Sequence, residues 1–352
     1  MATGRIIVKN FGPIHQADIE LPDIVVFIGQ QAAGKSTLAK LIHFFRLVTD
    51  DAPLSRDLPE IFRKFFFSDV WLRQSPDAEI EYIGSDGMNF IFKNRKLSYT
   101  DIKKSPRRSV FIPAGRAVYS LVSNAMFSLS LESVNIDPNI LLFGRSIETV
   151  KSDDPFEKDP YLSDLSSAIL KGKFRFAGNE NRIYFSENKY VTIDRASSGQ
   201  QEVFPVLLLL ANALASEKNH CITIEEPEAH LYPYAQHKLV EFITRVYNSP
   251  HASNSFVITT HSPYILTSFN NLLFAHQAAG IGDESGKAVE RVVPETSRVN
   301  PEDFAAYYVE GGKLRSVFEE GLISDNEIDD ASEDIAEVFD RLIDIYNDSR
   351  HG

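Results

Sequence analysis

The sequence lacks three features that would place it outside the ordinary soluble proteins. Among its 352 residues there is one cysteine, Cys221, which cannot form a disulfide within the chain or supply a cysteine-rich zinc site. No basic segment followed by a continuous apolar stretch opens the chain, so we expect no export and a cytoplasmic location. The longest apolar run, residues 203–215, is interrupted by Pro205 and Asn212 and is too short to span a bilayer, so no membrane partner is expected.

An excess of positive charge is also missing. Lysine and arginine number 36 against 49 acidic residues, which gives a formal net charge of −13. This field repels DNA, RNA and anionic membranes, so any nucleic-acid contact must be local. Residues 93–108 are basic and short of acids, and they are either a DNA contact or a solvated loop. Their cations are Lys93, Arg95, Lys96, Lys103, Lys104, Arg107 and Arg108.

Residues 50–164 lack an apolar heptad repeat, which argues against a long coiled-coil arm. The length of the chain favours one large domain with an added lobe, and we expect residues 49–169 to form an inserted, mainly helical lobe. The core would then cover residues 1–48 and 170–300. Residues 301–352 are expected to be an acidic helical tail with one apolar stripe, docked on the body or on a partner. The stripe consists of Ile335, Val338, Phe339, Leu342 and Tyr346.

A glycine-bounded loop at residues 29–36 follows an apolar strand pattern at 24–28 and precedes helical spacing at 38–45. Its sequence, GQQAAGKS, satisfies the phosphate-loop pattern, whose glycines let backbone N–H groups curl round phosphates at a helix N-terminus. Lys35 would neutralise the β and γ phosphates of ATP, and the Ser36 hydroxyl would ligate Mg²⁺. The nucleotide-binding residues predicted here are Gly29, Gln30, Gln31, Ala32, Ala33, Gly34, Lys35, Ser36 and Thr37.

Two adjacent carboxylates, Glu225 and Glu226, follow the apolar strand pattern at residues 221–224. The carboxyl ends of central strands are where open α/β sheets bind ligands. Glu225 would hold Mg²⁺ through its water shell, and Glu226 would orient or deprotonate the attacking water. Glu228, close by, is instead expected to belong to a helix N-cap region.

A third motif, Thr-His-Ser-Pro at residues 260–263, follows the strand pattern at 256–259. A lone histidine is more often structural. Just past this strand, however, a polar side chain faces the γ phosphate, so His261 can sense the phosphate or position water.

A fourth motif lies between a predicted meander of three strands, residues 173–193, and an apolar helix at 201–214. Small residues at the start of this helix expose backbone N–H groups and make an anion site. The phosphate loop already holds the nucleotide of its own subunit, so the second site is expected to serve the γ phosphate of a facing subunit. Its residues are Ser197, Ser198, Gly199 and Gln200.

These four motifs, in this order, resemble those of the ABC-type ATPases of the RecF, SMC and OLD (overcoming lysogenization defect) group. They are most similar to compact bacterial AAA-type ATPases related to the OLD proteins. The resemblance implies an α/β fold with an ABC-type P-loop core, namely a mixed central sheet, flanking helices and an antiparallel β-subdomain. It also implies ATP hydrolysis with Glu226, His261 and Lys35 as catalytic residues. In the implied homodimer, or higher homo-oligomer, Ser197 and Gly199 would touch the nucleotide of the other subunit.

Several positions depart from the family pattern. Ala196 and Ser198 replace a leucine and a second glycine of the usual signature, and Glu225 replaces the Walker B aspartate. Both variants resemble the OLD-related branch. The glutamine of the loop that joins core and lobe is not assigned; Gln74 and residues 112–116 are its candidate regions. No Toprim domain is expected after residue 261, because the acidic residues there show no metal-binding arrangement.

The motifs leave three functions to weigh. The first is a regulatory ATPase that controls a separately encoded effector protein, in bacterial antiphage defence or a toxin-linked system. The second is a RecF-like DNA-repair ATPase that would use residues 93–108 to contact DNA. The third, an ABC transporter motor, is disfavoured by the negative charge, the unusual signature and the insertion.

Overall fold

The computed structural model describes residues 4–48, 62, 65–66, 74–85, 87–100, 107–116, 137–150, 155–177, 180–216 and 218–324. Most of its strands join one sheet. These are β1 Gly4–Phe11, β2 Ile14–Leu21, β3 Ile24–Ile28, β4 Glu79–Ile83, β5 Asn89–Lys93, β6 Lys96–Tyr99, β7 Arg107–Ile112, β11 Asn219–Glu225, β12 Ser255–Thr260, β13 Phe304–Glu310 and β14 Lys313–Ser316. The strand order is β6-β5-β4-β1-β2-β14-β13-β3-β12-β11-β7.

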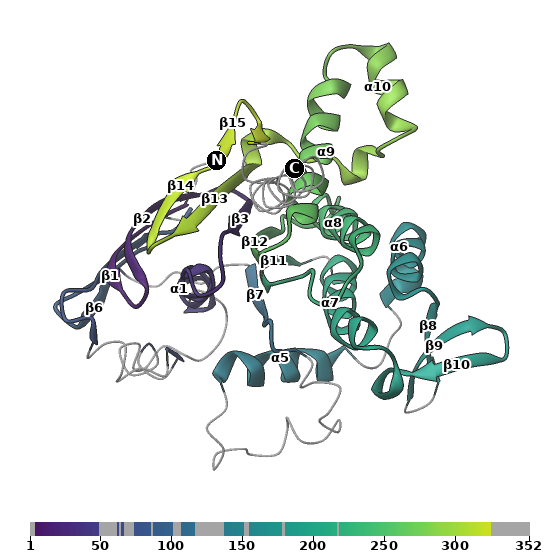
Figure 1. Ribbon diagram of the computed structural model, residues 1–352, viewed down its shortest axis with the longest axis horizontal. Coiled ribbons are helices and arrows are strands. Elements are labelled where there is room, and N and C mark those ends of the chain that lie inside the picture. The colour runs from purple at the N-terminus through teal and green to yellow at the C-terminus, as the bar shows by residue number, and fades with distance from the viewer. Residues whose placement is uncertain are drawn as a thin grey trace, which may run out of the picture.

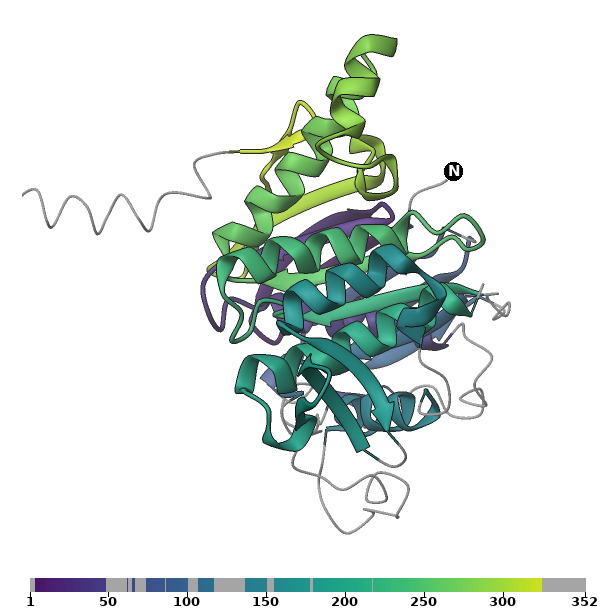
Figure 2. The same ribbon diagram turned by 90° about the vertical axis from the view of Figure 1, so that its right-hand side faces the viewer.

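Helices cover both faces of this sheet, with α1 on one side and α7 and α8 on the other (Figure 1). The helices are α1 Lys35–Val48, α5 Pro138–Thr149, α6 Pro160–Leu170, α7 Ser198–Ala215, α8 Pro233–Tyr247, α9 Pro263–Ala279 and α10 Asp283–Glu290. Two smaller sheets are built from β8 Lys173–Ala177, β9 Glu180–Ser186 and β10 Lys189–Thr192, and from β15 Phe318–Glu319 and β16 Leu322–Ile323. Figure 2 shows α10 projecting beyond the body. None of the helices in the described ranges is long and apolar enough to cross a membrane.

The sheet has a parallel and an antiparallel part. Strands β13, β3, β12, β11 and β7 are parallel neighbours. Strands β1, β2, β4, β5 and β6 pair antiparallel. The structure therefore has the predicted mixed sheet, flanking helices and antiparallel β-subdomain. Because carboxyl ends of parallel strands meet at one edge, the loops after β3, β11 and β12 lie together.

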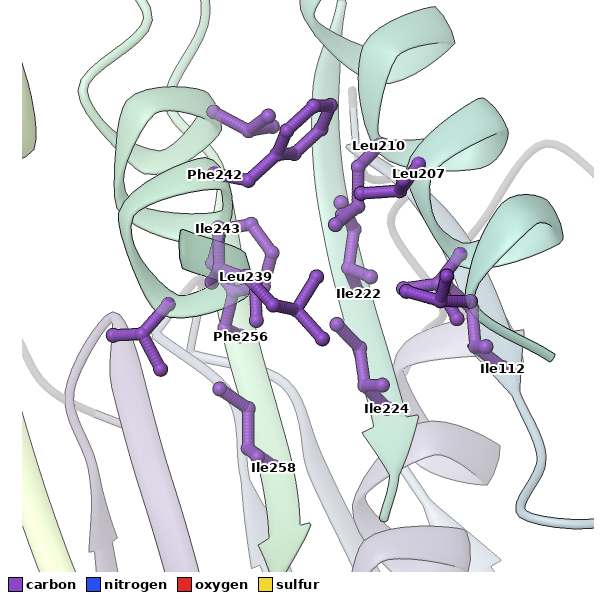
Figure 3. Packing of buried hydrophobic residues seen from close by; sticks show 14 of the residues in the cluster. Ile112, Leu207, Leu210, Ile222, Ile224, Leu239, Phe242, Ile243, Phe256 and Ile258 are labelled. Carbon is purple, nitrogen blue, oxygen red and sulfur yellow. The ribbon is translucent and has the colours of Figure 1, made fainter. Parts of the chain in front are cut away.

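Apolar side chains on both faces of the parallel strands explain why these strands are buried. In β3 all five residues are buried, with Val25 and Phe27 in the cluster around α1 and the alternate residues in the cluster with α7 and α8. Such two-sided burial is typical of central parallel strands. Figure 3 shows the second cluster, where side chains of β11 and β12 interdigitate with those of α7 and α8. Its labelled residues are Ile112, Leu207, Leu210, Ile222, Ile224, Leu239, Phe242, Ile243, Phe256 and Ile258.

Two predicted segments differ from the structure. Residues 49–169 were expected to be an inserted, mainly helical lobe. Their described part contains the helices α5 and α6, but its strands β4 to β7 extend the main sheet at both of its ends. The start of the expected helical tail, residues 301–324, instead forms strands, and β13 lies directly beside β3. Pairing with neighbouring strands outweighed the weak local patterns in both cases. The predicted stripe at residues 335–346 lies outside the described residues.

The basic segment expected as one DNA contact is divided between distant strands. Lys93 and Lys96 belong to β5 and β6, whereas Arg107 and Arg108 begin β7. These strands are at opposite ends of the strand order and stand well apart in Figure 1. Lys93 also forms an ion pair with Glu79 at 2.7 Å. Lys103 and Lys104 lie outside the described residues, so the described cations do not form a single patch.

Candidate nucleotide-binding site

The glycine loop between β3 and α1 has a backbone that requires its two glycines. Gly29 has φ 146° and Gly34 has φ 109°, backbone angles that residues with a Cβ rarely adopt. A Cβ on Gly29 would collide with the Val309 carbonyl of β13, and one on Gly34 would collide with the side chain of Ile14. Neighbouring strands therefore hold the loop in its curled form, in front of the N-terminus of α1.

Lys35 folds back over this loop. Its Nζ donates to the Gly29 carbonyl at 2.7 Å, to the Gln30 carbonyl at 2.8 Å and to His261 Nδ1 at 3.3 Å. Burial lowers the pKa of Lys35 to about 8, while Glu226 and Glu228 act in the opposite direction. A triphosphate beside this ammonium group would favour its charged form.

Three of the predicted motifs line one cavity of about 420 Å³. The cavity is lined by Pro13, Gln31, Ala32, Ala33, Gly34, Lys35, Ser36, Thr37, Glu226 and His261. Gly29 and Gln30 contribute through their carbonyls, which hold Lys35. Phosphate-loop backbone, cation, carboxylate and histidine thus meet where the carboxyl ends of β3, β11 and β12 converge.

His261 connects the cation and the carboxylate. Its Nδ1 accepts from Lys35, and its Nε2 lies 3.2 Å from Glu226 Oε1. An ammonium group can only donate, so with Lys35 charged the imidazole is the neutral tautomer that donates Nε2–H to Glu226. The backbone of Glu226 has φ 45°, and its N–H donates to the Thr259 carbonyl at 2.9 Å. With this geometry, Glu226 is one of the residues that line the cavity.

Glu228 does not lie in the helix N-cap region expected for it, but accepts hydrogen bonds from the last residue of β12 and the residue after it. Its Oε1 accepts from the Thr260 hydroxyl and from the His261 amide, each at 2.7 Å. The following helix α8 starts at Pro233, and its N-cap, Tyr232, makes no side-chain capping bond. Glu228 is therefore not a helix N-cap; its carboxylate fixes the turn that carries His261.

Glu225 and Ser36 fit a magnesium site. Glu225 is 5% exposed; its Oε2 accepts from the Ala114 amide at 3.2 Å, and its buried Oε1 has no hydrogen-bond partner in the described residues. Burial raises the pKa of Glu225, and Lys40, the Ala114 amide and the Ser36 hydroxyl counter this effect. A buried carboxylate oxygen without a donor, next to a hydroxyl, is what a hard divalent cation prefers. When bound, Mg²⁺ would supply neutralisation of the phosphate charge here.

The signature residues 197–200 lie outside this cavity. Ser197 is the N-cap of α7 and forms a capping box with Gln200, whose side chain also donates to the Leu170 carbonyl at 2.7 Å. A Cβ on Gly199 would come within 2.5 Å of the His230 carbonyl, so glycine permits the close approach of α7 to the loop after β11. Within one chain, this anion-type helix start therefore does not contribute to the phosphate cavity.

For the loop that joins core and lobe, the sequence named only two candidate regions, Gln74 and residues 112–116. Gln74 is exposed and does not line the cavity. Instead, the segment at residues 113–116 reaches the acidic pair, through the Ala114 amide and through the Arg116 side chain, whose Nη1 donates to the Glu225 carbonyl at 2.8 Å. The sequence does contain a pattern that indicates this strand and loop: the apolar residues at the end of β7 are followed directly by Pro113, Ala114 and Gly115.

Comparison with known proteins gives one family match. Residues 136–266 match the family model described as an AAA ATPase domain. No curated protein matches the chain in sequence.

Solved structures with a similar arrangement are distant in sequence. The SMC head domain from Thermotoga maritima is 13% identical, with a TM-score of 0.44, and the match covers 91% of this chain and 100% of that one. An SMC head bound to the C-terminal winged-helix domain of ScpA is 12% identical, with a TM-score of 0.44 and coverage of 91% and 98%. An ATP-binding cassette of an ABC transporter in its ADP conformation is 14% identical, with a TM-score of 0.38 and coverage of 94% and 96%.

The matched segment contains the signature, the acidic pair and His261, and the phosphate loop precedes it in the chain. The chain is therefore similar to AAA ATPase domains over residues 136–266, and a phosphate-loop sequence precedes that segment.

Proposed function

We propose that the chain hydrolyses ATP as an ABC-type dimer, in which each site is completed by the signature of the other subunit. The observation that carries the proposal is the Lys35–His261–Glu226 chain of contacts across one phosphate cavity. The imidazole of His261 contacts both Lys35, the cation that would bind phosphate, and Glu226, the carboxylate that would activate water. This spacing suits attack on a γ phosphate rather than nucleotide binding alone.

The residues divide the work of hydrolysis. Glu226 orients the attacking water and accepts its proton as the water oxygen bonds to the γ phosphorus, while the bond from this phosphorus to the bridging oxygen breaks. Lys35 neutralises charge on the phosphates. His261, neutral and hydrogen-bonded to Glu226, keeps that carboxylate aimed into the cavity. The products are ADP and inorganic phosphate.

Dimerisation is proposed because a second anion-type site remains unused within the chain. The N–H groups of Ser197 and Gln200 bond within the capping box, so the first turn of α7 presents those of Ser198 and Gly199, which do not line the phosphate cavity of their own subunit. Two exposed tyrosines lie near the turn that follows the acidic pair, Tyr232 at 79% and Tyr234 at 50% exposure. A partner that covered this face would bury these rings and bring its own signature to the nucleotide.

A mixing experiment tests the shared site. Ser197→Asp keeps a side-chain oxygen for the helix cap but places a negative charge against the partner's γ phosphate, so it should abolish turnover. Lys35→Ala should be inactive for want of nucleotide binding. An equimolar mixture should regain up to about a quarter of wild-type turnover, because random pairing gives half heterodimers with one intact site each. Steady-state phosphate release measures it.

Ser197→Asn provides the matched control for that mixture, since it caps the helix without adding charge. It should lose less turnover than Ser197→Asp, because its side-chain amide can still donate to the γ phosphate and no negative charge faces that phosphate. If Ser197→Asp alone hydrolyses ATP normally, or if the mixture stays as inactive as its two components, the shared site is refuted.

We further propose that the nucleotide state controls a separately encoded effector in bacterial antiphage defence, on the strength of the OLD-type motifs. Cells carrying the gene with its genomic neighbours should then form fewer phage plaques than cells without them. Lys35→Ala and Glu226→Gln should each lose this protection. Protection that survives both substitutions would contradict a role for the nucleotide cycle, and absence of protection by the wild type would contradict the defence role.

A further inference from the structure

Arg116 is the largest fully buried side chain of the described structure, at 1% exposure. Its guanidinium donates to four backbone carbonyls: Nε to Glu202 at 3.0 Å, Nη1 to Pro113 at 3.3 Å and to Glu225 at 2.8 Å, and Nη2 to Glu226 at 2.8 Å. Burying a charged group costs free energy unless the group is well hydrogen-bonded. The four hydrogen bonds of Arg116 offset this cost.

These carbonyls belong to two parts of the site that are distant in sequence. Glu225 ends β11 and Glu226 follows it directly, beside the cavity, whereas Glu202 lies in the second turn of α7, next to the signature. The planar fork of a guanidinium can hold several acceptors in fixed directions, which a lysine ammonium cannot. Arg116 therefore ties the start of α7 to the backbone that sets the direction of the Glu226 side chain.

A second contact, between Glu202 and His230, also joins α7 to the turn after β11. The carboxylate of Glu202 lies 3.3 Å from His230 Nε2, and the carbonyl of His230 is the atom that a Cβ on Gly199 would meet. His230 follows the acidic pair by four residues and has a left-handed backbone, φ 57°. The first two turns of α7 are thus fastened to both ends of the turn at residues 225–230.

We propose that Arg116 is a positioning residue that couples the signature end of α7 to the catalytic carboxylate. When α7 shifts on contact with the nucleotide of the facing subunit, the fork transmits the shift to the Glu226 backbone and so to the water that Glu226 orients. Hydrolysis thereby depends on closure of the dimer rather than on ATP binding alone. The inference rests on the proposed function and concerns the regulation of that same site.

A purely structural Arg116 would act differently from a positioning one. Loss of packing lowers the melting temperature and reduces the amount of folded protein, but the folded fraction keeps its turnover. Loss of positioning lowers kcat while ATP still binds the glycine loop, and the effect runs through Glu226. A 1 Å misplacement of a catalytic group can cost on the order of 100-fold in rate.

A double-mutant cycle with Arg116→Lys and Glu226→Gln separates these roles in the full chain. Arg116→Lys alone should lower kcat by at least about tenfold and change KM by less than about twofold. In the Glu226→Gln background it should change the residual kcat by less than about twofold, because the group it positions is already lost. Assays are run below the melting temperature of every variant. Arg245→Lys is the matched control, since Arg245 is another little-exposed arginine, paired with Asp159 at 2.6 Å.

The outcomes are distinct. An unchanged kcat in Arg116→Lys, or effects that multiply in the double variant, overturns the coupling role and leaves the ATPase proposal standing. Normal turnover by Glu226→Gln itself overturns the catalytic role of Glu226 and with it the coupling, whereas a wild-type protein that binds ATP without hydrolysing it overturns the ATPase proposal. If Arg116→Lys does not fold, hydrogen exchange on the wild type decides: the non-hydrolysable analogue AMP-PNP should change protection at residues 198–202 and 225–230 together. A change confined to one of these segments would overturn the coupling.

Discussion

Lys35→Ala is expected to weaken binding of Mg·ATP by roughly 100-fold or more, about 3 kcal/mol. The substitution removes the only side-chain cation that lines the described phosphate cavity, and phosphate oxygens next to it would lose a charge-assisted donor. The loop itself should keep its shape, because its curl depends on Gly29, Gly34 and their strand neighbours rather than on the lysine. Isothermal titration calorimetry with Mg·ATP measures the change.

Lys238→Ala is the matched control for this measurement. Lys238 lies on α8 and pairs with Glu241 at 2.8 Å, away from the phosphate cavity. It should bind ATP as the wild type does. Intact ATP affinity in Lys35→Ala would refute the assignment of the phosphate loop.

Glu226→Gln is expected to lower kcat by about 10² to 10⁴-fold, the usual contribution of a positioned general base. An amide of the same shape can still accept from His261 but cannot take the proton of the attacking water. ATP affinity should remain close to that of the wild type, because the contacts of Lys35 with the loop carbonyls are unchanged. The dimer should therefore accumulate in ATP, which light scattering detects alongside the phosphate-release assay.

Glu241→Gln controls for the general effect of replacing a partly buried glutamate by its amide. Its turnover should match that of the wild type. If Glu226→Gln hydrolyses ATP at the normal rate, the base is another group and the part assigned to the Glu226–His261 pair is wrong.

Local sequence was enough to predict several elements of the fold, including those that carry the phosphate cavity. The loop at residues 29–36, the meander at 173–193 and the strands that end at Glu225 and Thr260 all have patterns set within a few residues. Glycine spacing and short β-branched runs report directly on backbone conformation. The carboxyl ends of parallel strands lie at one edge of a sheet. This rule predicts that Lys35, Glu226 and His261, which follow three such strands, lie close together.

Features that depend on partners distant in sequence were missed. The strand β13 was assigned to a helical tail because nothing in its own seven residues reveals that β3 lies beside it. The strands β4 to β7 were assigned to a lobe for the same reason. Arg116 has no sequence pattern that reveals four carbonyl acceptors, since these come together only when β7, β11 and α7 have packed.

The most direct test of the account is the structure of Glu226→Gln with ATP and Mg²⁺. The phosphates should lie in the glycine loop, with Lys35 moved from the carbonyls of Gly29 and Gln30 to the β and γ phosphates. The Ser197 hydroxyl and the Gly199 amide of a second chain should approach the γ phosphate to hydrogen-bond distance, about 3 Å. A nucleotide held elsewhere, or a Ser197 remote from every γ phosphate including those of neighbouring molecules in the crystal, would contradict the shared ATPase site.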